Sequence, residues 1–80
     1  MGAVILAQVQ DQPARESIRD ARGMIVGVIE RQRLTGNLVA RDRNGTIIGV
    51  YEERSRTTRD AHGRLVGTTN LLPALLLWAR

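Results

Sequence analysis

Short apolar runs alternate with polar turn residues through most of this chain. The runs Ile25–Ile29, Ile47–Tyr51 and Leu65–Thr69 are rich in β-branched and aliphatic residues, and Asp, Asn and Gly precede or follow them. This pattern is typical of β-strands. It predicts about six strands, near residues 15–20, 24–33, 38–42, 46–53, 56–60 and 64–69, with Ala3–Gln10 as a candidate seventh.

A repeat organises these strands. Residues 19–27, 41–49 and 59–67 align without gaps and share the pattern Arg-Asp-x-x-Gly-x-h-h-Gly, where h is an aliphatic residue. The copies begin 22 and then 18 residues apart. Unequal spacing favours hairpins with variable connections over a rigid solenoid.

The first half of each repeat has the chemistry of a tight turn. An aspartate at the start of a type I turn accepts backbone N–H groups, and a glycine three residues later takes the left-handed conformation that ends the turn. We therefore assign hairpin tips to the pairs Asp20/Gly23, Asp42/Gly45 and Asp60/Gly63. The predicted fold class is all-β, an antiparallel meander of three repeated hairpins.

Strict alternation predicts which side chains share a face of the sheet. One predicted face carries Val26, Val28, Ile48, Val50, Val66 and Thr68. The other carries Ile25, Ile29, Ile47, Tyr51, Leu65 and Thr69. Both faces would be apolar, so both need a cover, from the C-terminal segment, from barrel closure or from a second copy.

The second glycine of each repeat lies inside a predicted strand. These residues are Gly27, Gly49 and Gly67. Glycine there indicates either a repeated bulge that curls the sheet or a groove in which another chain or a helix lies against bare backbone.

The segment 70–80 is apolar on all sides, with Asn70 as a helix N-cap and Pro73 in a first turn. A free helix of this length is unstable in water, so the segment must pack, either on its own sheet or on a second subunit. The candidate residues for oligomer or partner contacts are Leu72, Leu75, Leu76, Trp78 and Tyr51. We expect a single domain over 1–80, with 1–14 as an N-terminal strand or linker, 15–69 as the hairpin repeats and 70–80 as the apolar tail.

The chain has 80 residues, no cysteine and one histidine, His62. A core of this size contributes only a few kcal/mol of net stability, and neither disulfides nor thiolate metal sites can add to it. We therefore expect a homo-oligomer, with no metal and no cofactor.

All 12 basic residues are arginine, and the formal net charge is +4. The arginines alternate with acids, as in a solvated surface with ion pairs. A stripe of arginines along one sheet edge remains a candidate binding site, formed by Arg19, Arg22, Arg41, Arg43, Arg59 and Arg64. Nucleic-acid binding ranks below protein binding because Tyr51 and Trp78 are the only aromatic residues available for base stacking.

Catalytic arrangements are not evident. A nucleophile would have to be Ser17 or Ser55 acting with His62, which falls in a predicted tip, and no nucleophile elbow surrounds either serine. Side chains of the adjacent pair Glu52-Glu53 point to opposite faces of a strand. The apolar run Leu71–Ala79 is too short to cross a bilayer. We expect a cytoplasmic protein that is not an enzyme.

The segment Thr58–Thr69, which reads TRDAHGRLVGTT, resembles one unit of the YD-type hairpin repeats. These occur in large bacterial secreted shell proteins and in short phage- or plasmid-encoded hairpin proteins. The resemblance departs from the family where Arg19, Arg41 and Arg59 replace the tyrosine before aspartate. It implies repeated antiparallel hairpins without catalysis and assigns no functional residue.

These observations predict a small non-catalytic protein that acts through protein–protein contacts as a homo-oligomer. A phage or other mobile element is the expected source, and inhibition of a host defence or regulatory complex is one concrete form of the activity. The alternatives are a structural or virion-assembly protein and a nucleic-acid-binding protein that uses the arginine stripe.

Overall fold

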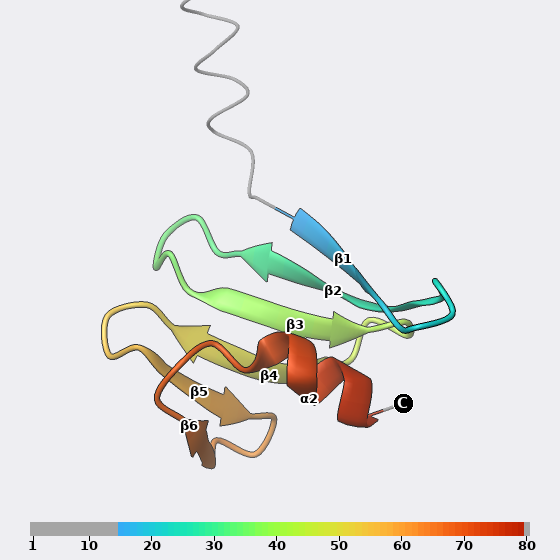
Figure 1. Ribbon diagram of the computed structural model, residues 1–80. Helices are drawn as coiled ribbons and strands as arrows, with labels where there is room; N and C mark the ends of the chain where they lie inside the picture. The colour runs from blue at the N-terminus through green and yellow to red at the C-terminus, as the bar shows by residue number, and fades with distance from the viewer. Residues whose placement is uncertain (1–14, 80) are drawn as a thin grey trace, which may run out of the picture.

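The computed structural model describes residues 15–79. One antiparallel sheet holds six strands in chain order, each hydrogen-bonded to the next (Figure 1). The strands are β1 (Arg15–Arg19), β2 (Ile25–Arg31), β3 (Leu38–Asp42), β4 (Ile47–Glu52), β5 (Thr57–Asp60) and β6 (Leu65–Gly67), and they are followed by one helix, α2 (Leu72–Ala79). The predicted antiparallel meander is therefore confirmed, and a short helix completes it. The candidate strand Ala3–Gln10 lies outside the described residues.

The three hairpin tips lie where the Asp-x-x-Gly motifs predict them. The tip glycines Gly23, Gly45 and Gly63 have φ angles of 85°, 85° and 81°. A side chain is disfavoured at such positive φ values, whereas glycine adopts them freely. The repeated motif thus reverses the chain three times, and the turns at 32–37 and 53–56 connect one hairpin to the next.

A β-bulge interrupts each hairpin just before its second glycine. Gly27 lies opposite Ile18, but Ile25 lies opposite Arg19, so Val26 is an extra residue in β2. The same shift makes Ile48 extra in β4 and Val66 extra in β6. The predicted bulge is confirmed in all three repeats.

The bulges overturn part of the predicted face assignment. Val26 is buried with the helix residues Leu72 and Leu76, and Ile48 packs against the same cluster. Strict alternation separated Val26 from Ile29 and Ile48 from Tyr51, and it placed Ile25 and Ile47 on the face of Ile29 and Tyr51; both assignments were wrong. Alternation failed because a bulge adds one residue to one strand and turns that side chain to the other side.

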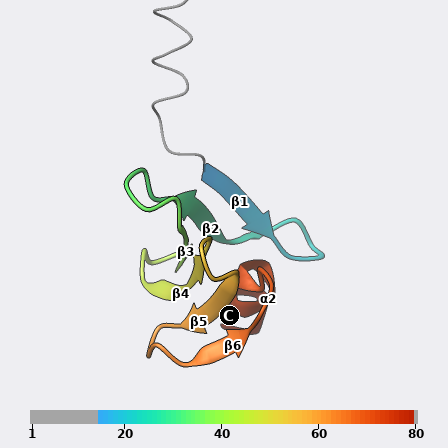
Figure 2. The ribbon, with the colours of Figure 1, turned by 90° about the vertical axis from the view of Figure 1, so that its left-hand side faces the viewer.

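Helix α2 covers one face of the sheet, over β2, β3 and β4 (Figures 1 and 2). The buried core on this side consists of Val26, Ile29, Ala40, Leu72 and Leu76. Asn70 Oδ1 accepts the N–H of Leu72 at 3.1 Å, which satisfies one of the N–H groups at the start of the helix. Of the two predicted placements of the apolar tail, the structure has the one on its own sheet.

The second glycine of each repeat lies directly beneath the C-terminal segment, which consists of α2 and the residue before it, Leu71. A Cβ atom at Gly49 would lie 2.8 Å from Leu75 Cδ1 and 2.8 Å from the carbonyl oxygen of Arg59. A Cβ atom at Gly67 would lie 2.5 Å from Leu71 Cδ1. The predicted groove over bare backbone is therefore also present, and the chain fills it with its own C-terminal segment.

Candidate binding surfaces

The aspartate of each repeat holds its hairpin tip through one carboxylate oxygen. Its Oδ1 atom accepts the backbone N–H groups two and four residues later, at 2.9 and 3.0 Å in every copy. The tip glycine donates its N–H to the aspartate carbonyl oxygen, at 2.9 to 3.0 Å. The donors to Oδ1 are Arg22 and Met24 for Asp20, Asn44 and Thr46 for Asp42, and His62 and Arg64 for Asp60. These bonds explain why the motif recurs.

The repeated arginine also has a structural partner, which the sequence analysis missed. Nη1 of Arg19, Arg41 and Arg59 donates to the carbonyl oxygen of Gly23, Gly45 and Gly63, at 2.7, 3.0 and 3.1 Å. The constant four-residue separation from arginine to glycine was the available signal. Each guanidinium is thus fixed against its own hairpin tip.

The strand register places these three arginines on the sheet face away from α2. Gly27 and Gly49 face the helix, so their neighbours Val28 and Val50 face the other way. Val28 lies opposite Arg41, and Val50 lies opposite Arg59. Directly opposed residues in antiparallel strands share a face. Ile18 lies opposite Gly27 and therefore faces the helix. Its neighbour Arg19 faces the other way, with Arg41 and Arg59.

Each of the three arginines has an aliphatic residue directly opposite it. The pairs are Arg19 with Ile25, Arg41 with Ile47, and Arg59 with Leu65. Ile25, Ile47 and Leu65 expose 38%, 39% and 56% of their surface. We call these six residues, with Val28, Val39 and Val50 between them, the open face.

Two glutamates partly neutralise the open face. Glu30 Oε1 accepts from Arg41 Nε at 3.2 Å, and Glu30 Oε2 accepts from Arg15. Glu52 Oε1 lies 3.9 Å from Arg59 Nε. Desolvation raises the pKa of Glu30, but the hydrogen bonds and charges of Arg15 and Arg41 outweigh it, so that pKa is lowered. The face therefore carries an excess of positive charge without being a continuous polycation.

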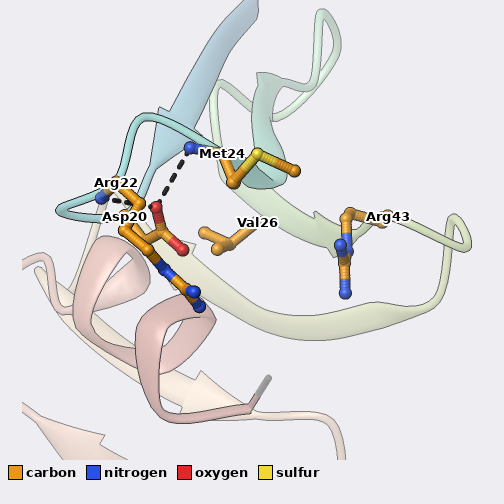
Figure 3. Close-up of a pocket in the computed structure, with 5 residues that line it drawn as sticks. All are labelled: Asp20, Arg22, Met24, Val26 and Arg43. Carbon is orange, nitrogen blue, oxygen red and sulfur yellow. Dashed lines mark hydrogen bonds between the residues drawn. The ribbon is translucent and has the colours of Figure 1, made fainter.

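The tip arginines fall into two groups. Arg64 Nε bonds Asp60 Oδ2 at 3.2 Å. The backbone N–H of Arg64 is the main cause of a lowered pKa of Asp60. Arg22 and Arg43, from the first and second tips, instead line one hollow (Figure 3). The structure thus brings Arg22 and Arg43 together and leaves Arg64 at the third tip.

Most of the candidate oligomer residues pack inside this chain. Leu72 and Leu76 are fully buried, and Leu75 and Tyr51 pack against the same core. Trp78 is 72% exposed, and the neighbouring Leu77 is 37% exposed. Of the predicted residues, Trp78 alone is mostly exposed and remains a candidate for contacts between copies. Leu77 joins it, although the sequence analysis did not single it out.

Of the residues considered for catalysis, Ser55 has side-chain partners and His62 is held through its backbone. Ser55 Oγ lies 3.1 Å from Glu52 Oε1 and 2.6 Å from Thr57 Oγ1. The backbone N–H of His62 donates to Asp60 Oδ1 within the third hairpin tip. Among the described residues, no group of three or more His, Asp or Glu side chains is placed to hold a metal ion. In the same part of the chain, α2 is the only helix and is too short to span a bilayer.

Comparison with known proteins adds no relative. No protein-family description matches the sequence, and searches of curated proteins and of solved structures found no match. The resemblance to YD-type hairpin repeats therefore depends only on the repeated residues themselves.

Proposed function

We propose that this chain is a non-catalytic protein-binding module that docks its open face on a partner protein. The observation that carries the proposal is the set of exposed aliphatic residues, Ile25, Ile47 and Leu65, each directly opposite an arginine that is anchored to a hairpin tip. The complementary surface on the partner would combine aliphatic side chains with carboxylates.

The anchoring of the arginines supports a recognition role. A flexible arginine loses side-chain entropy when it is immobilised in an interface. The bonds from Arg19, Arg41 and Arg59 to glycine carbonyls restrict these side chains before any partner arrives. Each guanidinium has further N–H groups that can donate to a carboxylate. Binding through them therefore costs less than binding through free surface arginines.

The charge balance favours a protein partner over a nucleic acid. Binding to a phosphate backbone depends on many unpaired cations. On the open face, Glu30 and Glu52 are paired with arginines, and aliphatic side chains separate the charges. Of the two aromatic residues, Tyr51 packs in the core on the helix side and Trp78 lies on α2. The open face therefore lacks an aromatic stacking platform.

Inhibition is one form of this function. A module that docks its open face can block a partner by occupying the surface that the partner needs for another contact. Self-association is the second candidate function, and the exposed Trp78 and Leu77 on α2 favour it. The two functions use opposite sides of the sheet, so they are separable by mutation.

The test is selection of binding peptides from a displayed random library on the immobilised full chain. We expect the selected peptides to alternate Asp or Glu with aliphatic residues. They should lose at least about tenfold in affinity for a triple variant, Ile25→Ser/Ile47→Ser/Leu65→Ser, as expected when apolar contacts worth ~1.4 kcal/mol are lost. The matched control is Leu77→Ser/Trp78→Ser on the helix side, which should leave binding unchanged.

Three outcomes would overturn the proposal. The peptides could lack acidic residues, the triple variant could bind them as well as the wild type, or the control could lose them equally. Circular dichroism and the amide NMR spectrum must first establish that both variants fold. Retention on double-stranded DNA that persists at about 0.3 M salt would instead support nucleic-acid binding, because weak nonspecific contacts are lost steeply with salt.

A further inference from the structure

A hollow opens on the sheet between the first two hairpin tips. It has a volume of about 700 Å³ and is lined by Asp20, Arg22, Met24, Val26 and Arg43 (Figure 3). Val26 is a buried core residue on the helix side, whereas Met24 is 57% exposed. The hollow therefore differs from the open face in position and in composition. It combines an apolar lining with charged side chains from two hairpins.

The two arginines in the hollow differ from those of the open face. Arg19, Arg41 and Arg59 each donate to a tip carbonyl oxygen, and Arg64 donates to Asp60. Within residues 15–79, the guanidinium groups of Arg22 and Arg43 have neither a hydrogen bond nor an ion pair. Figure 3 shows both guanidinium groups extending to the same side, with Val26 between them. Their N–H donors are therefore available to a ligand.

We propose that this hollow is a binding site for a ligand with two carboxylates on a short hydrocarbon body. Arg22 and Arg43 would each take one carboxylate, because the planar guanidinium matches the two oxygens of that group. Met24 and Val26 would contact the hydrocarbon between them. Asp20 has its Oδ1 occupied by the backbone N–H groups of Arg22 and Met24, so it holds the tip that carries both residues. This site is independent of the proposed docking by the open face.

The chemistry could come from a free dicarboxylic acid or from two acidic side chains of a peptide. The test is a titration of the full chain with adipate and, separately, with the blocked tripeptide Glu-Leu-Glu. The readouts are the NMR signals of the arginine Nε–H groups and of the Met24 amide. We expect saturable shifts at Arg22, Arg43 and Met24, with a dissociation constant on the order of 1 mM for the tighter ligand. The tighter of the two ligands identifies the source, and either order supports the site.

The variant series separates a site from general attraction between charges. Arg22→Gln/Arg43→Gln should weaken binding of the tighter ligand at least about tenfold, whereas Arg54→Gln, at an exposed turn between hairpins, should leave it unchanged. Both tip residues are exposed, so the double variant should fold. If the double variant does not fold, the wild-type titration decides whether the site exists. A specific site shifts the NMR signals of Arg22 and Arg43 and leaves the signals of the other arginines unchanged.

Several results would overturn the site. Shifts that are equal at all arginines or do not saturate would indicate nonspecific attraction. Equal loss of binding in Arg54→Gln and in the double variant would have the same meaning. Inorganic phosphate that binds as tightly as adipate would show that the apolar lining contributes nothing. The fate of the open-face peptides in the previous experiment has no bearing on these results, so failure of one proposal is distinguishable from failure of the other.

Discussion

The two faces of this sheet differ in what lies against their apolar residues. On one face, glycines and small residues leave room for α2, and the leucines of the helix fill the space. On the other face, Val28 lies opposite Arg41 and Val50 lies opposite Arg59, so long charged side chains stand beside the valines. Val39 is only 6% exposed, and Glu30 and Val50 lie on either side of it.

The difference shows that the apolar residues on one side of a strand need not be covered by other apolar residues. Arginine and glutamate can lay their hydrocarbon stems over aliphatic residues while their charged ends stay in water. Charged neighbours from adjacent strands can therefore cover part of the open face within this chain, and the predicted cover by a second copy stays a prediction. The uncovered remainder, Ile25, Ile47 and Leu65, lies toward the hairpin tips, where the proposed partner would bind.

The largest effect should come from the helix-covered face. Leu76→Ala removes a side chain that is 1% exposed at the centre of the core. We expect a loss of about 3 to 5 kcal/mol in the free energy of unfolding, from lost burial and from the cavity that remains. Urea denaturation followed by circular dichroism measures it. Leu77→Ala, at the exposed side of the same helix, should cost less than about 1 kcal/mol; equal losses would mean that α2 is not docked as described.

A smaller effect should distinguish two adjacent residues that face opposite ways. Gly49→Val adds atoms where Leu75 and the backbone of Arg59 already lie, so α2 must shift. We expect a loss of about 2 to 3 kcal/mol, as for overpacking of a core. Val50→Leu adds one methylene on the open face and should change stability by less than about 1 kcal/mol. Equal tolerance at both positions would contradict the close contact between glycine and helix.

The hairpin tips belong to neither face and should show a smaller effect. Asp42→Ala removes the acceptor for the N–H groups of Asn44 and Thr46. Because these groups are exposed and can bond water instead, we expect a loss of about 1 to 2 kcal/mol. Thermal unfolding of Asp20→Ala, Asp42→Ala and Asp60→Ala should give similar shifts. A variant at only one tip with a large effect would show that the three copies are not equivalent.

The smallest effect should be the pH dependence of stability that arises from Glu30 on the open face. The pKa of Glu30 is lowered in the folded chain, so this carboxylate favours folding above the ordinary glutamate value of 4.5. That contribution is lost as the pH falls through the lowered pKa. Thermal melts between pH 7 and pH 2.5 should show the loss at the acid end, and Glu30→Gln should reduce the slope there. An unchanged slope would mean that the ion pairs with Arg15 and Arg41 do not form.

The repeat letters predicted the fold well because they encode local turn chemistry. Asp and Gly at fixed separation determine each tip, and the tips determine the order of the strands. The second glycines indicated a bulge, but they did not show which residue would be the extra one, so the face of Val26 and Ile48 was assigned wrongly. It became readable only from the register between strands.

The candidate sites were predicted only in part. The sequence singled out all six arginines, and the constant separation of Arg19, Arg41 and Arg59 from the tip glycines was an available signal of their common bond. The pairing of Arg22 with Arg43 in one hollow depends instead on side-chain geometry in three dimensions. Arg22 and Arg43 occupy different positions of the repeat, so alignment of the copies gives no reason to pair them.

Solvent paramagnetic relaxation of methyl groups tests most directly that one face is covered and the other open. A neutral gadolinium chelate should broaden the methyl signals of Ile25, Ile47 and Leu65 strongly, and those of Leu72, Leu76 and Ile29 weakly. The contrast should persist from low to high protein concentration. Equal protection of the two sets would show that the open face is covered after all, and equal broadening would show that α2 does not pack on the sheet.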